Sequence, residues 1–136
     1  MKIGIIGQGF VGTAVREGLK NFFNIETFDI NKESTCASIE EVCNKSDITF
    51  VCLPTPMKKD GSCYTGIVEK VLSEINNINK CNVIVVKSTI PPGTTAKWNK
   101  MFNNINLVFN PEFLTEANAI NDFKNQKRII IGGPKK

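Results

Sequence analysis

The feature that most constrains the fold is an alternation of two kinds of segment along the chain. Short apolar runs rich in β-branched residues, such as residues 2–6 and 48–53, alternate with longer stretches whose apolar residues recur at helical spacing. Continuous apolar strands are buried on both faces, which is typical of parallel sheets covered by helices. We therefore predict an α/β fold, a doubly wound parallel sheet of about six strands with helices on both faces.

The pattern places the individual elements. We expect strands at residues 2–6, 25–30, 48–53, 82–86, 107–109 and 128–131. We expect helices at residues 38–44, 67–75, 93–102 and 114–123, and a first helix whose apolar stripe is Val11, Val15, Leu19 and Phe22. Ser38, with Glu41 three residues further on, predicts the N-terminal cap of the second helix.

A glycine pattern follows the first predicted strand. Gly7, Gly9 and Gly12 form G-x-G-x-x-G between a strand and a helix, which is the context in which this pattern binds dinucleotides. Gly7 permits a tight turn, Gly9 lets the backbone approach a pyrophosphate, and Gly12 lets helix and strand pack closely. The N–H groups at the helix start would face the phosphates. On its own, the pattern fits simple chain turns equally well.

Asp29 favours dinucleotide binding over a simple chain turn. It ends the second predicted strand, 22 residues after Gly7. A carboxylate at this place can accept hydrogen bonds from both ribose hydroxyls of NAD, and it repels the 2′-phosphate of NADP. A helix cap or a surface charge is the alternative role. The glycine pattern and Asp29 together favour an NAD-binding, Rossmann-type fold.

Polar residues also follow the later strands. Leu53-Pro54-Thr55-Pro56 follows the third strand, Ser88 and Thr89 the fourth, and Asn110 to Glu116 the fifth. Because ligands of such sheets bind beyond the carboxyl ends of the strands, these loops are expected to meet at one crevice. Serine, threonine and proline also make good connections and caps. Five such loops at one edge nevertheless favour a binding site.

Composition narrows the class of protein. A chain of 136 residues can hold one domain with a real core, residues 1–136, and hardly two. The net charge of +4 comes from dispersed lysines, which is a poor case for nucleic-acid binding. No apolar run reaches membrane-spanning length and no signal peptide is visible, so we expect a cytoplasmic protein without a membrane partner.

The cysteines argue against metal chemistry. The chain has five of them, none spaced as C-x-x-C, and no histidine: Cys36, Cys43, Cys52, Cys63 and Cys81. This set does not predict a zinc site, and it excludes a histidine-dependent catalytic triad. We expect reduced thiols and no bound metal.

Longer motifs connect the chain to a family. The stretches IGIIGQGFVG, DITFVCLPTP, VVKSTIPPGTT and NPEFLTEANAINDFKNQKRIIIGG resemble the N-terminal NAD-binding domain of the UDP-glucose/GDP-mannose dehydrogenase family. The resemblance covers essentially all of the chain. Members of this family oxidise the C6 alcohol of a nucleotide-sugar to a carboxylate with two NAD molecules. The resemblance therefore implies NAD as cofactor and a nucleotide-sugar such as UDP-glucose as substrate.

The resemblance also implies roles for single residues. Thr89 corresponds to a threonine that hydrogen-bonds the reacting oxygen or a catalytic water. Glu112 corresponds to a carboxylate that assists hydrolysis of an acyl-enzyme, although first-turn carboxylates also simply stabilise helices. Glu112, Phe113, Leu114 and Thr115 are expected to bind the nucleotide-sugar, the last three through their backbone. The implied cofactor-binding residues are Gly7, Gln8, Gly9, Phe10, Val11, Gly12, Asp29, Leu53, Pro54, Thr55, Pro56, Ser88, Thr89 and Glu116.

Two departures from the family matter. Between Asp29 and Ser38 the chain is short, where family members usually carry a helix-containing segment with a basic residue near the adenosine, and Lys32 is the only local substitute. The family's nucleophilic cysteine, helper lysine and uridine-binding domain lie beyond the last residue of this chain. Without a thiolate there is no route to a thioester intermediate, so the full oxidation is not assigned to this polypeptide alone.

Three hypotheses remain open. The first is a dehydrogenase half that works with a separately encoded C-terminal catalytic half, or that descends from a complete enzyme. The second is a nucleotide-binding module without turnover, and the third is a reductase of another Rossmann family completed by dimerisation. Thr89, Glu112 and Glu116 favour the first, whereas the missing cysteine favours the second. A homo-oligomer is compatible with each.

Overall fold

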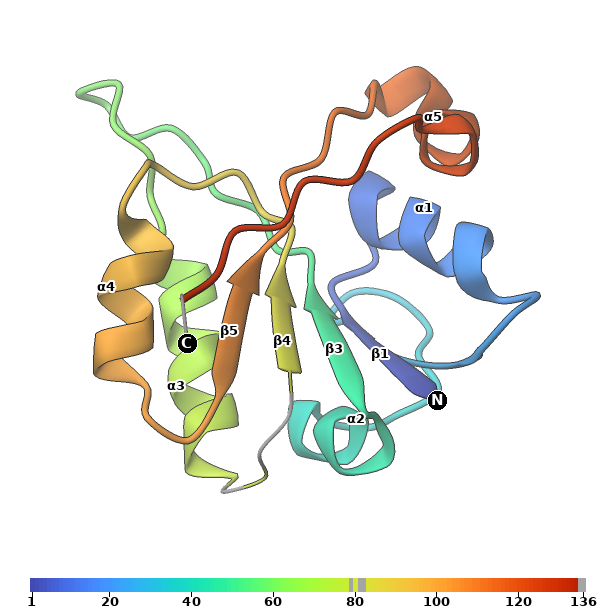
Figure 1. The fold of residues 1–136 in the computed structure, drawn as a ribbon, viewed down its shortest axis with the longest axis horizontal. Coiled ribbons are helices and arrows are strands. Elements are labelled where there is room, and N and C mark those ends of the chain that lie inside the picture. The colour runs from blue at the N-terminus through green and yellow to red at the C-terminus, as the bar shows by residue number, and fades with distance from the viewer. Residues whose placement is uncertain (79, 81–82, 135–136) are drawn as a thin grey trace.

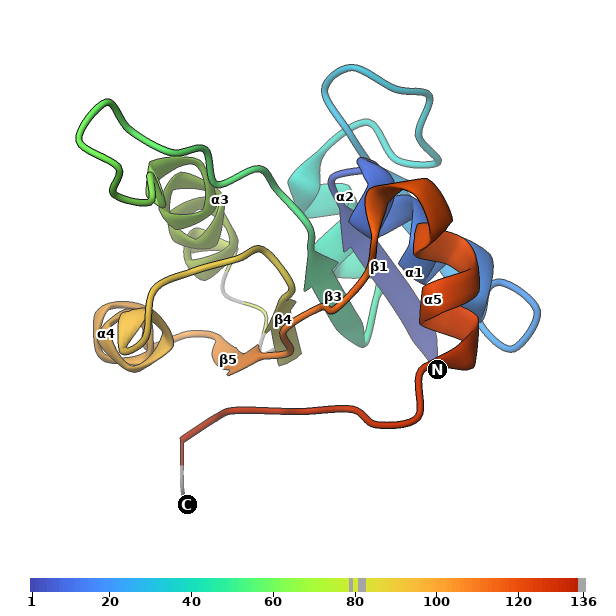
Figure 2. The ribbon, with the colours of Figure 1, turned by 90° about the horizontal axis from the view of Figure 1, so that it is seen from above.

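The computed structural model describes residues 1–78, 80 and 83–134, and it shows a β-sheet between two layers of helices (Figures 1 and 2). The sheet has five strands in the order β2-β1-β3-β4-β5, and every pair is parallel. This confirms the predicted α/β fold. The strands are β1 (Lys2–Ile6), β2 (Asn24–Phe28), β3 (Ile48–Val51), β4 (Val83–Val86) and β5 (Asn106–Phe109).

The helices lie close to their predicted places. They are α1 (Phe10–Leu19), α2 (Ile39–Lys45), α3 (Gly66–Asn77), α4 (Thr94–Met101), η1 (Glu116–Asn118) and α5 (Ala119–Asn125). Two details differ from the prediction: Phe22 lies beyond the end of α1 with 76% of its surface exposed, and the last helical region is split into η1 and α5. Within the described residues, no helix combines the length and the apolar character that a membrane crossing requires.

The predicted sixth strand at residues 128–131 is wrong. The chain is extended here, but it meets β5 only through an isolated antiparallel bridge between Phe109 and Gly132. Ile129 and Ile131 are 66% and 67% exposed. Their β-branched side chains suit a strand, but strand formation depends on pairing and burial that this run does not receive. The predicted strand start at residue 82 lies outside the described residues, as does Cys81.

The sheet separates two apolar cores. Ile3 and Ile5 of β1 pack with Val15 of α1 on one face, and Phe123 of α5 covers the same cluster. On the other face, Ile6 belongs to a larger cluster with residues of α2, α3 and α4, among them Val42, Leu72 and Trp98. Figure 2 shows the two helical layers on opposite sides of the sheet. Helices on both faces are therefore confirmed.

The outer edge of β2 is covered by the short segment that joins β2 to α2. The Thr27 amide donates to Thr35 Oγ1 at 2.8 Å, and the Thr35 amide donates back to Thr27 Oγ1 at 3.1 Å. The Thr27 carbonyl accepts from the Cys36 amide at 3.1 Å. The shortened connection thus seals the middle of this edge strand with hydrogen bonds from its own chain.

Candidate cofactor-binding site

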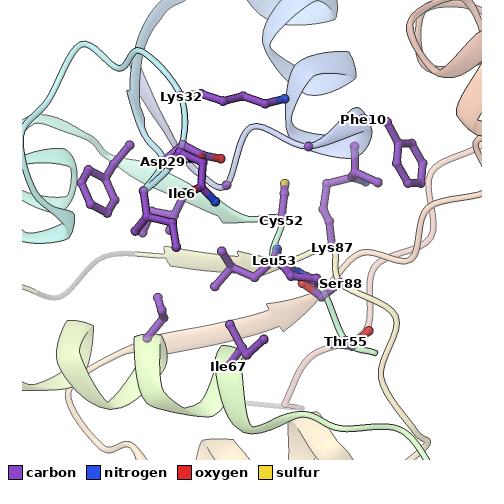
Figure 3. Close-up of a pocket in the computed structure, with 18 of the residues that line it drawn as sticks. Ile6, Phe10, Asp29, Lys32, Cys52, Leu53, Thr55, Ile67, Lys87 and Ser88 are labelled. Atoms are coloured by element: carbon purple, nitrogen blue, oxygen red, sulfur yellow. Dashed lines mark hydrogen bonds between the residues drawn. The ribbon is translucent and has the colours of Figure 1, made fainter. Parts of the chain in front are cut away.

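A cavity of about 580 Å³ lies at the carboxyl ends of the strands (Figure 3). Its walls come from the loops that follow all five strands and from α3, so the predicted crevice is present. Its size is within the range of pockets that hold small ligands and cofactors. The predicted site residues that line it are Gly7, Gly9, Phe10, Val11, Asp29, Leu53, Pro54, Thr55, Ser88, Thr89 and Glu112.

The remaining predicted site residues do not line this cavity. Gln8 and Gly12 belong to the glycine loop, and Pro56 follows the wall formed by Thr55. The other four lie in the segment after β5: Phe113, Leu114, Thr115 and Glu116. The Phe113 side chain is 67% exposed, whereas Leu114 is half-buried. Their expected contact with a nucleotide-sugar stays a prediction.

The glycine loop has the geometry that its pattern predicts. Gly7 has φ +91°, and a Cβ there would lie 2.5 Å from the carbonyl oxygen of Cys52. A Cβ on Gly12 would overlap the carbonyl oxygen of Gly7, so close packing of helix and strand requires a glycine. A Cβ on Gly9 would meet no atom within 4 Å. Packing inside the protein therefore requires a glycine at positions 7 and 12, whereas it does not require one at position 9.

The start of α1 suits an anion. Gly9 is the N-cap residue, and no side chain of the described residues caps the helix. The first-turn N–H groups of a helix lack intrahelical partners and favour negative charge in front of them. The cavity wall at Gly9, Phe10 and Val11 thus fits a pyrophosphate.

Gln8 holds the glycine loop in place through hydrogen bonds to neighbouring segments. Its side chain, 2% exposed with the rest of the residue, accepts from Arg16 Nη1 at 2.7 Å and donates to the Glu33 carbonyl at 2.8 Å. The Gln8 carbonyl accepts from Lys32 Nζ at 2.5 Å. Gln8 therefore ties the glycine loop to α1 and to the segment after β2, which is a positioning task.

Asp29 stands at one end of the cavity, directly beside the glycine loop. Its Oδ2 accepts from the Gln8 amide at 2.6 Å, and its Oδ1 accepts from the Asn31 amide at 2.8 Å. A carboxylate has about four acceptor positions, so each oxygen retains one for a further donor. The fixed carboxylate can accordingly accept from two ribose hydroxyls.

The loops after β3 and β4 are linked to one another at the other end. The Leu53 amide donates to Ser88 Oγ at 3.0 Å, and Thr55 Oγ1 donates to the Thr89 carbonyl at 2.6 Å. Cys63 Sγ also lies 3.6 Å from the Thr89 carbonyl. These contacts fix the backbone of Thr89 beside the cavity.

The loop after β5 contributes one carboxylate. Glu112 lines the cavity, and its Oε2 accepts from the Leu114 amide at 2.7 Å. Beyond it, the amide and hydroxyl of Thr115 both donate to Asp122 Oδ2, and these hydrogen bonds lower the pKa of Asp122. Hydrogen bonds within the segment thus hold residues 112–115 in place.

Apart from Asn31, the sequence reasoning missed two polar residues of the wall, Cys52 and Lys87. Each lies directly before a predicted site residue at the end of a strand, which is the signal that could have identified it. Burial raises the pKa of the Cys52 thiol to about 12, and it lowers the pKa of Lys87. Ile67 and Val71, expected only as a packing stripe of α3, face the cavity as well.

Sheet order, glycine loop and cavity together define a Rossmann-like nucleotide-binding domain. Sequence comparison gives the family: the NAD binding domain of the UDP-glucose/GDP-mannose dehydrogenase family matches residues 17–136. The chain belongs to this family.

Individual relatives agree with this assignment. The chain is 36% identical over 105 residues to a UDP-glucose 6-dehydrogenase of Campylobacter jejuni, covering 76% of this chain and 27% of that protein. It is 32% identical over 167 residues to MJ1054 of Methanocaldococcus jannaschii, covering 97% and 18%. A UDP-glucose dehydrogenase structure from Pyrobaculum islandicum superposes with a TM-score of 0.84 at 27% identity, over 98% and 41%. The chain thus spans less than half the length of these relatives.

Proposed function

We propose that the chain is the NAD-binding part of a nucleotide-sugar 6-dehydrogenase that acts on UDP-glucose or a similar compound. The observation that carries the proposal is the convergence of the glycine loop, Asp29, Thr89 and Glu112 on one cavity. Asp29 would hold the adenosine ribose and the start of α1 the pyrophosphate. The nicotinamide would then lie at Ser88 and Thr89, where the loops after β3 and β4 are linked.

The residues at this end support oxidation of an alcohol. When bound, NAD supplies the hydride acceptor. The Thr89 hydroxyl would hydrogen-bond the reacting oxygen. The hydrogen bond from Thr55 to the Thr89 carbonyl supports this role, because it holds the Thr89 backbone beside the cavity. The Glu112 carboxylate can accept a proton from an alcohol or a water, a task that carboxylates in clefts perform.

A complete oxidation to the carboxylate needs a thiolate that we place outside this chain. Burial raises the pKa of Cys52 to about 12 and that of Cys43 to about 11, so both thiols keep their protons near neutrality. A protonated, buried thiol is a poor nucleophile. We therefore propose that a C-terminal half supplies the reactive cysteine, in the cytoplasm, where unpaired thiols persist.

A second candidate function is a nucleotide-binding module without turnover. One observation favours it: Phe113, Thr115 and Glu116 are exposed outside the cavity, so the sugar end of the site is incomplete in this chain. The two candidates share NAD binding and differ in whether added catalytic residues restore chemistry.

The test is a pair of titrations of the purified chain, one with NAD and one with UDP-glucose. We expect saturable NAD binding and poor UDP-glucose binding, because the uridine-binding residues of the family are not among these residues. The Gly9→Val variant is the matched control, since its fold should be unchanged and its phosphate site filled. An NAD titration without any binding would overturn the proposal.

A further inference from the structure

Lys87 occupies an unusual position for a lysine. It directly follows β4, its amide donates to the Val51 carbonyl at 2.9 Å, and only 3% of the residue is exposed. It nevertheless lines the cavity immediately before Ser88 (Figure 3). Lysines are rarely buried to this extent unless a partner compensates the charge.

The partners of the Lys87 ammonium are neutral. Nζ donates to Asn110 Oδ1 at 2.9 Å and lies 3.4 Å from the Asn110 carbonyl oxygen, and the Phe123 ring centroid is 5.9 Å away. Asn110 is fixed in turn, because its Nδ2 donates to the Ile130 carbonyl at 2.8 Å. Among the ion pairs of residues 1–78, 80 and 83–134, none includes Lys87.

Two titratable groups that line the same cavity interact electrostatically with Lys87, the Cys52 thiol and the Glu112 carboxylate. The Cys52 thiol is uncharged near neutrality because burial raises its pKa to about 12. Glu112 is only half-buried, so water screens its charge, whereas the ammonium of Lys87 is shielded from water. A charge in a low-dielectric environment acts more strongly on its neighbours than the same charge in water.

We infer that Lys87 determines which redox form of the cofactor the cavity prefers, and that its buried ammonium makes NADH bind more tightly than NAD⁺. This inference rests on the proposed function, because it requires the nicotinamide to lie at Ser88 and Thr89. The oxidised nicotinamide ring carries a positive charge, and the reduced ring is neutral. The ammonium therefore repels only the oxidised form.

The experiment compares the dissociation constants of NAD⁺ and NADH at neutral pH. In the wild-type chain we expect NADH to bind roughly tenfold more tightly, the size of effect that a single partly screened charge produces. Lys87→Met keeps the aliphatic stem and should bring the ratio close to one. Lys87→Arg should retain the preference, and Lys100→Met, which removes an exposed lysine of α4, should not change it.

Two further measurements test the role of Lys87 even if the Lys87→Met variant fails to fold. Glu112→Gln removes the opposing negative charge, so the preference for NADH should increase. In the wild-type chain the preference should be present at neutral pH and disappear as the pH rises through the pKa of Lys87, which burial lowers. Above that pKa the side chain is neutral and repels neither form.

The outcomes separate the two proposals. If the wild-type chain binds neither form, the proposed function fails and this inference fails with it. If both forms bind but their ratio is the same in the wild type, in Lys87→Met and at alkaline pH, only the role of Lys87 is overturned.

Discussion

The two ends of the cavity differ in how completely this chain builds them. At the end formed by β1 and β2, Gln8 and Asp29 are fixed by hydrogen bonds to the backbone of neighbouring loops, and Gly12 is packed against Gly7. At the end formed by β5, Glu112 is the one described residue after this strand that lines the cavity, and Phe113, Ile129 and Ile131 are exposed. This chain thus contributes much more of the cavity wall beside β1 and β2 than beside β5.

Under the proposed function, this difference would make cofactor binding separable from chemistry. The proposed adenosine and pyrophosphate site is built from one short stretch of chain, because the hydrogen bonds that hold Gln8 and Asp29 join residues within 8–34. A sugar bound at Glu112 would instead lack contacts on its outer side.

The largest effect concerns turnover. Incubated with NAD and UDP-glucose, the isolated chain should show no sustained NADH production, because loss of one member of a catalytic unit costs several orders of magnitude in rate. Absorbance of NADH measures this directly. Addition of the proposed C-terminal half should restore NADH production. The Glu112→Gln variant of this chain, mixed with the same C-terminal half, should again produce none. Robust turnover by the chain alone, surviving replacement of all five cysteines, would contradict the contrast.

The second effect separates two glycines of the same loop. Gly9→Val should weaken NAD binding at least tenfold, about 1.4 kcal/mol, without changing the melting temperature, because a Cβ at Gly9 meets no protein atom within 4 Å. Gly12→Ala should destabilise the fold by about 1–3 kcal/mol, because its Cβ overlaps the Gly7 carbonyl. Calorimetry and thermal melts measure the two quantities. Equal destabilisation by both variants would show that Gly9 is a packing glycine.

The third effect tests Asp29. NADP should bind about tenfold or more weakly than NAD, because its 2′-phosphate would meet the fixed carboxylate. Asp29→Asn removes the charge and keeps the shape, so the gap between the two cofactors should narrow. Equal affinities of the wild-type chain for NAD and NADP would remove Asp29 from the site.

For the smallest effect, we expect no difference between the unfolding transitions of the two ends of the sheet. If residues 1–136 form one domain, both ends of the sheet should unfold in a single transition. Trp98, the sole tryptophan, is fully buried and donates to Glu69 Oε2 at 2.7 Å, so its fluorescence reports on the larger core. Its melting curve should coincide with that from far-UV circular dichroism. Two separate transitions, or a broad melt with strong dye binding at room temperature, would contradict a single domain.

The fold was largely predictable because its signals are local. The apolar runs of β1 and β3 and the helical stripe of α3 are read from neighbouring residues, and the predicted cap of α2 is present, with the Glu41 amide donating to Ser38 Oγ at 3.1 Å. The meeting of five loops at one edge follows from parallel topology alone. Most of the residues that line the cavity could therefore be predicted without knowing which distant parts of the sequence are in contact.

The predictions that failed concern features that depend on contacts between residues far apart in the sequence. Residues 128–131 have strand-like composition, but whether they pair depends on β5 and on what covers them, which no local pattern contains. The burial of Lys87 depends on Asn110 and Phe123, both more than twenty positions away in the sequence. Likewise, nothing in the motif NPEFLTE indicates that the Phe113 side chain is 67% exposed.

The hydrogen bonds along the outer side of β2 affect how copies of this protein can meet. Exposed strand edges are the places where unrelated chains add themselves to a sheet and start to aggregate. The amide and the carbonyl of Thr27 already bond to Thr35 and Cys36. A strand from another chain could therefore not form backbone hydrogen bonds with the middle of β2. A second copy of the chain is therefore hindered from extending the sheet at the middle of β2.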